Sequence, residues 1–363
     1  MSTSEYDSYR PPDSPRRRRR GGARRRRRGP GASDGSREMP VVPEADFSSY
    51  YDRPVVKPPP WDERIAGYLF LGGVAGGSAL LGLGAQLTDR PVLRRNSRLA
   101  ALAGAGLGTV ALVTDLGRPE RFLNMLRVFK VTSPMSLGTW VLSGFATGAG
   151  IAAASEVDRM TGSRLPLGPL RRWLRALEGP AGVGAALFAA PLAVYTAVLL
   201  SDTAVPTWNA AREDLPFVFV SSASMAAGGL AMITSPVREA GPARVLAGIG
   251  AAGDVLATQV MERRMDPVAA EPLHEGVPGR LLRWSERLTV AGGLGTVLGG
   301  RHRVVAAASG AALLTASALT RLAVLQAGLD STADPRYTVE PQKRRLAARR
   351  EAGVTDDAIT TVG

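Results

Sequence analysis

Long apolar stretches separated by short polar connections fill the chain from about Ile65 to Leu329. The stretches are rich in Ala, Leu, Val and Gly and contain almost no charged residues. They are too long and too uniformly apolar for the amphipathic helices of a water-soluble core. Their length fits the hydrocarbon layer of a bilayer, which is roughly 30 Å thick. The pattern therefore predicts an all-α integral membrane protein.

Eight segments are predicted to cross the membrane, each as a helix, because lipid offers no partner for free backbone groups. They run approximately over residues 65–86, 98–116, 135–155, 180–201, 215–234, 243–261, 286–300 and 303–327. The seventh is the weakest, since it is short, rich in glycine and begins with Glu286 and Arg287. The predicted organisation is a tail of residues 1–60, an eight-helix transmembrane bundle of residues 61–330 and a polar C-terminal tail of residues 331–363.

Two connections carry an amphipathic pattern. In residues 118–130, one side of a helix would hold Phe122, Met125, Leu126 and Phe129. The segment Leu170 to Leu177 alternates apolar residues with three arginines. Each pattern predicts a short helix lying along the lipid headgroups, with a plain connecting loop as the alternative.

Small residues recur at three- and four-residue spacing in the first two spans, as Gly72, Gly73, Gly76, Gly77, Gly104 and Gly108. In lipid, small faces let helix backbones approach closely and gain dispersion contacts. A dinucleotide-binding loop is disfavoured because no strand precedes these glycines. The pattern predicts tight packing between the first helices.

Positive charge is concentrated at the N-terminus. The 363 residues include 45 Lys and Arg against 32 Asp and Glu, and residues 1–60 alone hold 14 against 8. Arg16–Arg20 and Arg24–Arg28 are two blocks of five arginines. The tail is predicted to be disordered, because it has too few apolar groups to offset the entropy of ordering it. It is expected to touch anionic lipid headgroups rather than nucleic acid, since no aromatic residues alternate with the arginines.

The distribution of Lys and Arg also bears on orientation. The loops are nearly balanced, with 10 on one side of the predicted bundle and 13 on the other. Both tails are basic, with 15 Lys and Arg in residues 1–64 and 7 from Arg321 to Arg350. The positive-inside rule then predicts a multi-pass protein of the inner or plasma membrane with both termini cytoplasmic.

The chain contains no cysteine and only two histidines, His274 and His302, both in connecting segments. It therefore has no thiolate ligands for an iron–sulfur cluster and no histidine pair for a haem near the bilayer centre. No metal or haem is expected on this chain. If it handles electrons, the carrier belongs to a partner or is a diffusible ligand.

Four acidic residues fall within or at the ends of predicted spans: Asp115, Asp202, Asp254 and Glu286. An ionisable group in a transmembrane helix is costly and usually faces a partner, a cavity or a ligand. Pairing with arginines at the rim, or helix capping, is one interpretation for Asp115, Asp202 and Glu286. Asp254 lies near the middle of the sixth span, beyond the reach of that explanation. Asp202 and Asp254 are the candidates for proton transfer.

Several strings together resemble the NrfD-like membrane subunits, the family that includes the polysulfide reductase membrane anchor. They are W-D-E-R-I-A-G-Y-L-F-L-G-G-V-A-G-G from Trp61, T-D-L-G-R-P-E-R-F-L-N-M-L from Thr114, S-P-M-S-L-G-T-W from Ser133 and Y-T-A-V-L-L-S-D-T-A-V-P-T-W from Tyr195. The resemblance covers roughly residues 60–330. The second and third strings are its most specific part.

The resemblance implies an eight-helix membrane subunit of a molybdopterin oxidoreductase complex, without catalytic residues of its own. Such a subunit exchanges electrons between membrane quinone, either menaquinone or ubiquinone, and a ferredoxin-like [4Fe–4S] subunit. That partner relays them to a molybdenum-containing catalytic subunit. A quinone site needs an apolar slot, donors to the carbonyl oxygens and a proton route. Tyr68, Asp115, Arg118 and Tyr195 are the candidate quinone-binding residues.

Two other functions remain open at this point. Eight spans and Asp254 also suit a membrane transporter or a proton channel. A third possibility is a passive anchor that holds soluble subunits at the membrane and binds no redox ligand.

Overall fold

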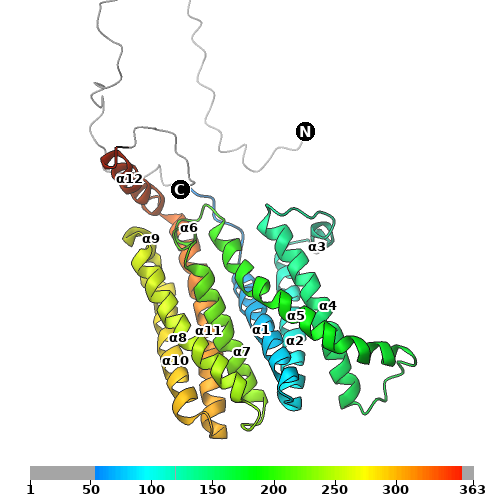
Figure 1. Cartoon of the computed structure of the whole chain (residues 1–363). Coiled ribbons are helices and arrows are strands. Elements are labelled where there is room, and N and C mark those ends of the chain that lie inside the picture. Colours follow the sequence, from blue (N-terminus) through cyan, green and yellow to red (C-terminus); the bar gives the residue numbers. More distant parts are fainter. Residues whose placement is uncertain (1–53, 119, 354–363) are drawn as a thin grey trace, which may run out of the picture. The chain divides into compact units, whose positions relative to one another are not determined.

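A computed structural model describes residues 54–118 and 120–353, and this part of the chain is helical without strands (Figure 1). The long helices are α1 (Glu63–Leu87), α2 (Pro91–Asp115), α4 (Pro134–Met160), α5 (Leu170–Ser201), α7 (Leu215–Thr234), α8 (Gly241–Arg264), α10 (Gly276–Gly299) and α11 (Arg303–Ala333). The short ones are α3 (Arg121–Met125), α6 (Pro206–Ala210), α9 (Pro267–His274) and α12 (Arg336–Glu351).

The long helices run up and down in pairs, α1 with α2, α4 with α5, α7 with α8 and α10 with α11. The first two pairs form one half of the bundle and the last two form the other. The halves meet where α1 packs against α7 and α11, and α5 against α7. We call the end where α1 begins and α11 ends the terminal face, which also carries α3, α6, α9 and α12 (Figure 1). The opposite end is the distal face.

Six helices in the described part are long and apolar enough to cross a membrane: α1, α2, α4, α5, α7 and α11. The remaining two predicted spans lie on α8 and α10, helices of 24 residues each that carry more charge. The predicted start of the seventh span, residue 286, is too late, because α10 starts at Gly276. The charged first turns of α10 were predicted to be a connection, but they are helical.

Residues 170–177 were predicted to form a short helix of their own; they are helical, but they are the first turns of α5. Proline usually interrupts a helix by removing one backbone donor, yet α5 continues through Pro180 and Pro191. Tertiary ion pairs hold its first turns in place: Arg175 Nη2 lies 2.7 Å from Asp158 Oδ2 of α4, and Arg171 Nε lies 3.3 Å from the same oxygen.

The other predicted headgroup helix, over residues 118–130, shrinks to the single turn α3. Side-chain hydrogen bonds compete with a longer helix here. Ser136 Oγ donates to Val128 O at 2.8 Å and accepts from Lys130 N at 3.0 Å, which ties the segment to the start of α4. Phe122 is half-buried, as are Met125 and Leu126, whereas Phe129 is exposed.

The predicted tails are only partly described. The two arginine blocks lie outside the described residues. At the other end, α11 continues to Ala333 and α12 follows it. Arg336 donates to Glu271 Oε1 of α9 at 2.6 Å and to the Tyr337 hydroxyl at 2.9 Å. These bonds raise the pKa of the Arg336 guanidinium, Tyr337 first and Glu271 second, and anchor the base of α12.

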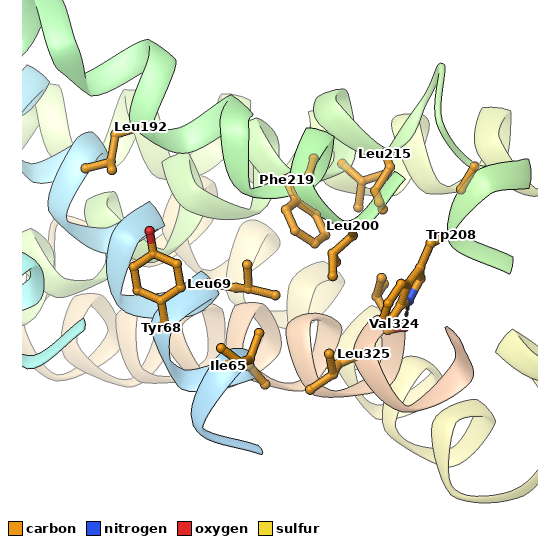
Figure 2. Close-up of a cluster of buried hydrophobic side chains, with 14 of the residues drawn as sticks. Ile65, Tyr68, Leu69, Leu192, Leu200, Trp208, Leu215, Phe219, Val324 and Leu325 are labelled. Carbon is orange, nitrogen blue, oxygen red and sulfur yellow. Dashed lines mark hydrogen bonds between the residues drawn. The ribbon is translucent and has the colours of Figure 1, made fainter. Parts of the chain in front are cut away.

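Trp208 of α6 is the largest fully buried side chain. Its Nε1 donates to Val324 O of α11 at 2.7 Å (Figure 2), and its ring stacks on Trp61 with 5.6 Å between centroids. Gly328 of α11 leaves room for it, since a Cβ there would lie 1.9 Å from Trp208 Nε1. One tryptophan thus joins the segment before α1, the α5–α7 connection and α11.

Trp208→Ala is expected to lower the free energy of unfolding by about 3–5 kcal/mol, because a large buried side chain and its hydrogen bond are lost. Thermal unfolding of the purified protein in detergent measures the effect. Trp173→Ala is the matched control, since Trp173 is 60% exposed. Equal melting temperatures for the two variants would contradict the central role of Trp208.

Candidate functional site

Two of the predicted site residues meet inside the first half of the bundle. The hydroxyls of Tyr68 from α1 and Tyr195 from α5 are hydrogen-bonded to each other. Tyr68 is buried beside the apolar cluster that contains Leu69 and Leu192 (Figure 2), and Tyr195 is partly exposed. The pair places two phenolic hydroxyls, each able to donate or accept a hydrogen bond, in apolar surroundings.

A glycine of α4 makes room for this tyrosine pair, and a glycine of α2 lies in ordinary contact distance of it. A Cβ on Gly138 of α4 would lie 2.1 Å from Cε2 of Tyr195, and one on Gly108 of α2 would lie 3.5 Å from Cδ2 of Tyr68. Close packing between the first two helices was predicted from their glycines. The role of Gly138 was missed, although it lies within the string S-P-M-S-L-G-T-W. The position of Tyr195 thus depends on this glycine.

Asp115, the last residue of α2, lies at the terminal end of the same half. Its carboxyl faces that of Asp62, with Arg64 alongside. Asp62 caps α1 by accepting from Arg64 N at 2.7 Å, and Arg64 Nη1 donates to Thr114 O at 3.1 Å. Six residues separate Asp62 from Tyr68 along α1, a rise of about 9 Å. Two carboxyls and an arginine therefore form a rim at the terminal end of α1, one to two helical turns from the tyrosine pair.

Arg118 does not join this rim through its side chain. It is exposed, and its guanidinium makes no hydrogen bond or ion pair to residues that the structure describes. Gly117, with φ of +67°, turns the chain between Asp115 and Arg118. The basic neighbour of Asp115 is Arg64 of α1 instead.

The two proton-transfer candidates lie in different settings. Asp202 is the exposed C-cap residue of α5 on the terminal face. Asp254 is 5% exposed in the interior of α8, where Arg321 and Thr289 are its neighbours. Its Oδ1 atom has no hydrogen-bond partner among the described residues. Asp254 therefore faces α10 and α11 in the second half of the bundle.

Arg321 was missed as a site residue, because it was counted with the basic C-terminal tail. It lies instead within α11 and is 1% exposed. Nη2 donates to Phe219 O at 2.7 Å, and the guanidinium carbon lies 3.5 Å from the centroid of the Phe219 ring. Nε and Nη1 have no hydrogen-bond partner among the described residues. A lone arginine amid the apolar residues of the eighth span was the available signal.

A buried ion-pair cluster at the distal face was also missed. Glu156 of α4 is 2% exposed and its Oε1 lies 2.8 Å from both Arg94 Nε and Arg98 Nη1 of α2. Arg98 is itself 5% exposed and donates to Gln86 Oε1 at 2.6 Å. Arg159 approaches the other oxygen of Glu156 at 3.3 Å. The cluster locks α2 against α4 and has no connection to the tyrosine pair through hydrogen bonds between described residues.

Within the described residues, no group of three or more His, Asp or Glu side chains is arranged to hold a metal ion. The polar groups that lie close together in the structure are hydroxyls, carboxyls and guanidinium groups. They suit hydrogen bonding and proton exchange with an organic ligand.

Residues 54–242 match the family described as Polysulphide reductase, NrfD. This segment is just over half of the chain. The chain belongs to the NrfD family. As an NrfD protein with six long apolar helices, it is a multi-pass membrane protein. A search of curated proteins finds no match. The NrfD segment contains the tyrosine pair, Asp115, Arg118 and Asp202, whereas Asp254 and Arg321 lie beyond it.

Proposed function

We propose that this NrfD-family chain is the quinone-interacting membrane subunit of a molybdopterin oxidoreductase complex. It passes electrons between membrane quinone and a partner [4Fe–4S] subunit, with coupled proton transfer. The observation that carries the proposal is the pair of tyrosine hydroxyls enclosed by α1, α2, α4 and α5. Its position within the segment that matches the family supports the same assignment.

The side chains present fit a quinone. A bound menaquinone or ubiquinone would supply two-electron, two-proton redox chemistry. Tyr68 and Tyr195 are the residues that would hold a carbonyl oxygen, because a phenol donates to it without carrying charge. Asp115 at the rim exchanges protons with water, and the exposed Arg118 follows it in the chain. This arrangement separates the apolar binding groups from the water-facing proton carrier.

The electron partner is expected on the terminal face. The chain has no cysteine, so the iron–sulfur cluster must belong to another subunit. The rim near the tyrosine pair lies on this face, and the segment after Asp115 is basic through Arg118, Arg121, Arg127 and Lys130. The molybdopterin catalytic subunit then docks through the [4Fe–4S] subunit rather than on the bundle itself.

The proposed membrane arrangement has eight spans. At 1.5 Å per residue, the 24 residues of α8 or α10 reach about 36 Å, enough to cross the hydrocarbon layer. Both then cross beside α7 and α11, against which they pack. An even number of spans puts both termini on one side, and the basic tails make that side cytoplasmic.

Tyr195→Phe is expected to reduce quinol-dependent turnover of the purified complex about 100-fold, because a donor used in proton-coupled chemistry is lost. Tyr68→Phe should have an effect of the same order. Steady-state oxidation of a soluble quinol analogue measures both. Tyr337→Phe is the control, since Tyr337 belongs to α12 outside the bundle.

Turnover of the tyrosine variants and a vesicle transport assay separate the alternative functions. A passive anchor predicts unchanged turnover in both tyrosine variants, with the complex fully assembled. A transporter or proton channel predicts ion or proton movement into vesicles by the chain alone, without quinol or partner subunits. Either result would overturn the proposed function.

A further inference from the structure

A polar cleft lies in the second half of the bundle, between α8, α9 and α10. Its volume is about 100 Å³, enough for several water molecules. Its lining includes Asp254, Thr258, Gln259, Glu262, His274 and Glu286. Nine of its thirteen lining residues carry a polar or charged side chain, which is unusual for a lipid-embedded helix interface. The cleft needs an explanation other than helix packing.

The mouth of the cleft is on the terminal face. His274, at the end of α9, is more than half exposed, and its Nε2 lies 4.0 Å from Glu262 Oε2. Glu286 of α10 is also exposed. From Glu262 the cleft follows α8 inward for eight residues, about 12 Å, to Asp254. Charged groups surround the entrance, so water has partners at its surface.

The inner end of the cleft contains an unsatisfied polar atom. Asp254 is only 5% exposed, and its Oδ1 has no hydrogen-bond partner among the described residues. Buried polar atoms are nearly always paired with protein or with water. Near it, Ser285 Oγ and Thr320 Oγ1 lie 2.7 Å apart. These groups can hydrogen-bond water molecules entering from the mouth.

Toward the distal face, the α8–α10 interface is closely packed, since a Cβ on Gly293 of α10 would lie 3.1 Å from Ala251 Cβ of α8. The neighbouring interfaces of α7 with α8 and α11 are closer still. A Cβ on Gly250 of α8 would lie 2.4 Å from Met225 N, and one on Gly228 of α7 would lie 2.6 Å from Ala247 N. The crossing of α7 and α11 is equally tight, with a Cβ on Gly229 only 2.6 Å from Gly310 O. Helices packed this closely leave no room between them for a continuous row of water molecules.

Arg321 lies between Asp254, at the inner end of the cleft, and α1 of the first half of the bundle. Its guanidinium faces Asp254 and Phe219, and its Nη2 lies 3.5 Å from where a Cβ on Gly73 of α1 would be. It thus lies where α8, α11, α7 and α1 come together. A fixed positive charge there repels hydronium and separates the cleft from the tyrosine pair.

We propose that this cleft is a water-filled proton-access path that opens on the terminal face only and ends at Asp254. A proton moves from water to an Asp254 oxygen and returns to water by the same path. The path therefore protonates and deprotonates the carboxyl without carrying protons across the membrane. Glu262, His274, Glu286 and Arg283 set the charge at its mouth, and Arg321 sets it at the inner end. The proposal does not depend on quinone binding by the tyrosine pair.

Substituted-cysteine labelling tests the path, because the chain has no cysteine of its own. Thr258→Cys and Gln259→Cys place thiols in the cleft, and Ala247→Cys places one in the closed distal part. Glu120→Cys and Arg164→Cys report the terminal and distal faces, since both residues are exposed. The full chain in vesicles is treated with a membrane-impermeant cationic thiosulfonate, applied from outside alone or from both sides.

We expect Thr258→Cys and Gln259→Cys to react from the side that labels Glu120→Cys and not from the side that labels Arg164→Cys. Ala247→Cys should stay unlabelled from both. No reaction of either cleft thiol would show that the cleft is dry and would overturn the proposal. Reaction from both sides would show a through-channel and would also overturn it.

A second measurement tests the end point. A water-soluble carbodiimide should modify Asp254, detected by mass spectrometry, and prior thiosulfonate blocking of Thr258→Cys should prevent that modification. Asp254→Asn should leave thiol labelling unchanged, because the labelled positions lie between the mouth of the cleft and Asp254. Modification of Asp254 that persists after blocking would show a different route and contradict the proposal. Neither measurement uses quinol turnover, so a failed path is distinguishable from a failed quinone site.

Discussion

Replacing Glu156 with glutamine is expected to lower the free energy of unfolding by about 3–5 kcal/mol, the usual cost of breaking a buried ion pair on one side. Glu156 is 2% exposed and its carboxylate binds Arg94 and Arg98 of α2. Without the negative charge, Arg98 remains buried at 5% exposure and hydrogen-bonds to neutral acceptors, such as Gln86 Oε1 at 2.6 Å and the Glu178 carbonyl oxygen at 3.5 Å. Thermal or denaturant unfolding of the purified subunit measures the loss.

The matched control is an exposed ion pair. Arg212 and Glu213 lie 3.9 Å apart with side chains 45% and 71% exposed. Surface pairs of this kind contribute about 0–1 kcal/mol, so Glu213→Gln should leave the melting temperature nearly unchanged. If Glu156→Gln behaved like this control, the distal cluster would have no special part in joining α2 to α4.

Replacing Gly138 with alanine is expected to reduce quinol-dependent turnover about 100-fold while leaving the complex assembled. The added Cβ would lie 2.1 Å from Cε2 of Tyr195, so the ring must move away from its contact with Tyr68. A misplacement of about 1 Å at a reacting site is enough for a 100-fold loss. Overpacking of this kind also costs about 1–3 kcal/mol of stability. Turnover is measured in the complex and stability on the purified subunit.

Gly150→Ala is the control on the same helix, since no atom lies within 4 Å of a Cβ at that position. It should match the unsubstituted protein in both turnover and melting temperature. Normal turnover in Gly138→Ala would show that the position of Tyr195 is irrelevant to the reaction. The tyrosine pair would then lose its place in the proposed site.

The apolar pattern was sufficient to predict a helical membrane protein, because segment length and composition report directly on transfer into lipid. Each of the eight predicted segments lies on a long helix, and six meet the length and hydropathy needed to span. The strings around Asp115 and Gly138 were sufficient for the family. Helix ends were less predictable. The first turns of α5, from Leu170 on, are held by ion pairs of Arg171 and Arg175 with Asp158 of α4. Such a contact between helices cannot be read from the local sequence pattern.

The sequence by itself determined the helices, the family and the absence of thiolate ligands, since these depend on residue type and short-range order. Only the tertiary structure decided which side chains meet. It brought Tyr68 to Tyr195 across 127 positions of the chain, left the Arg118 side chain exposed, and placed Arg321 beside Asp254 rather than in a basic tail. Such pairings depend on how helix faces are rotated and how closely glycines let them approach. Those quantities are set by the packing of the whole bundle.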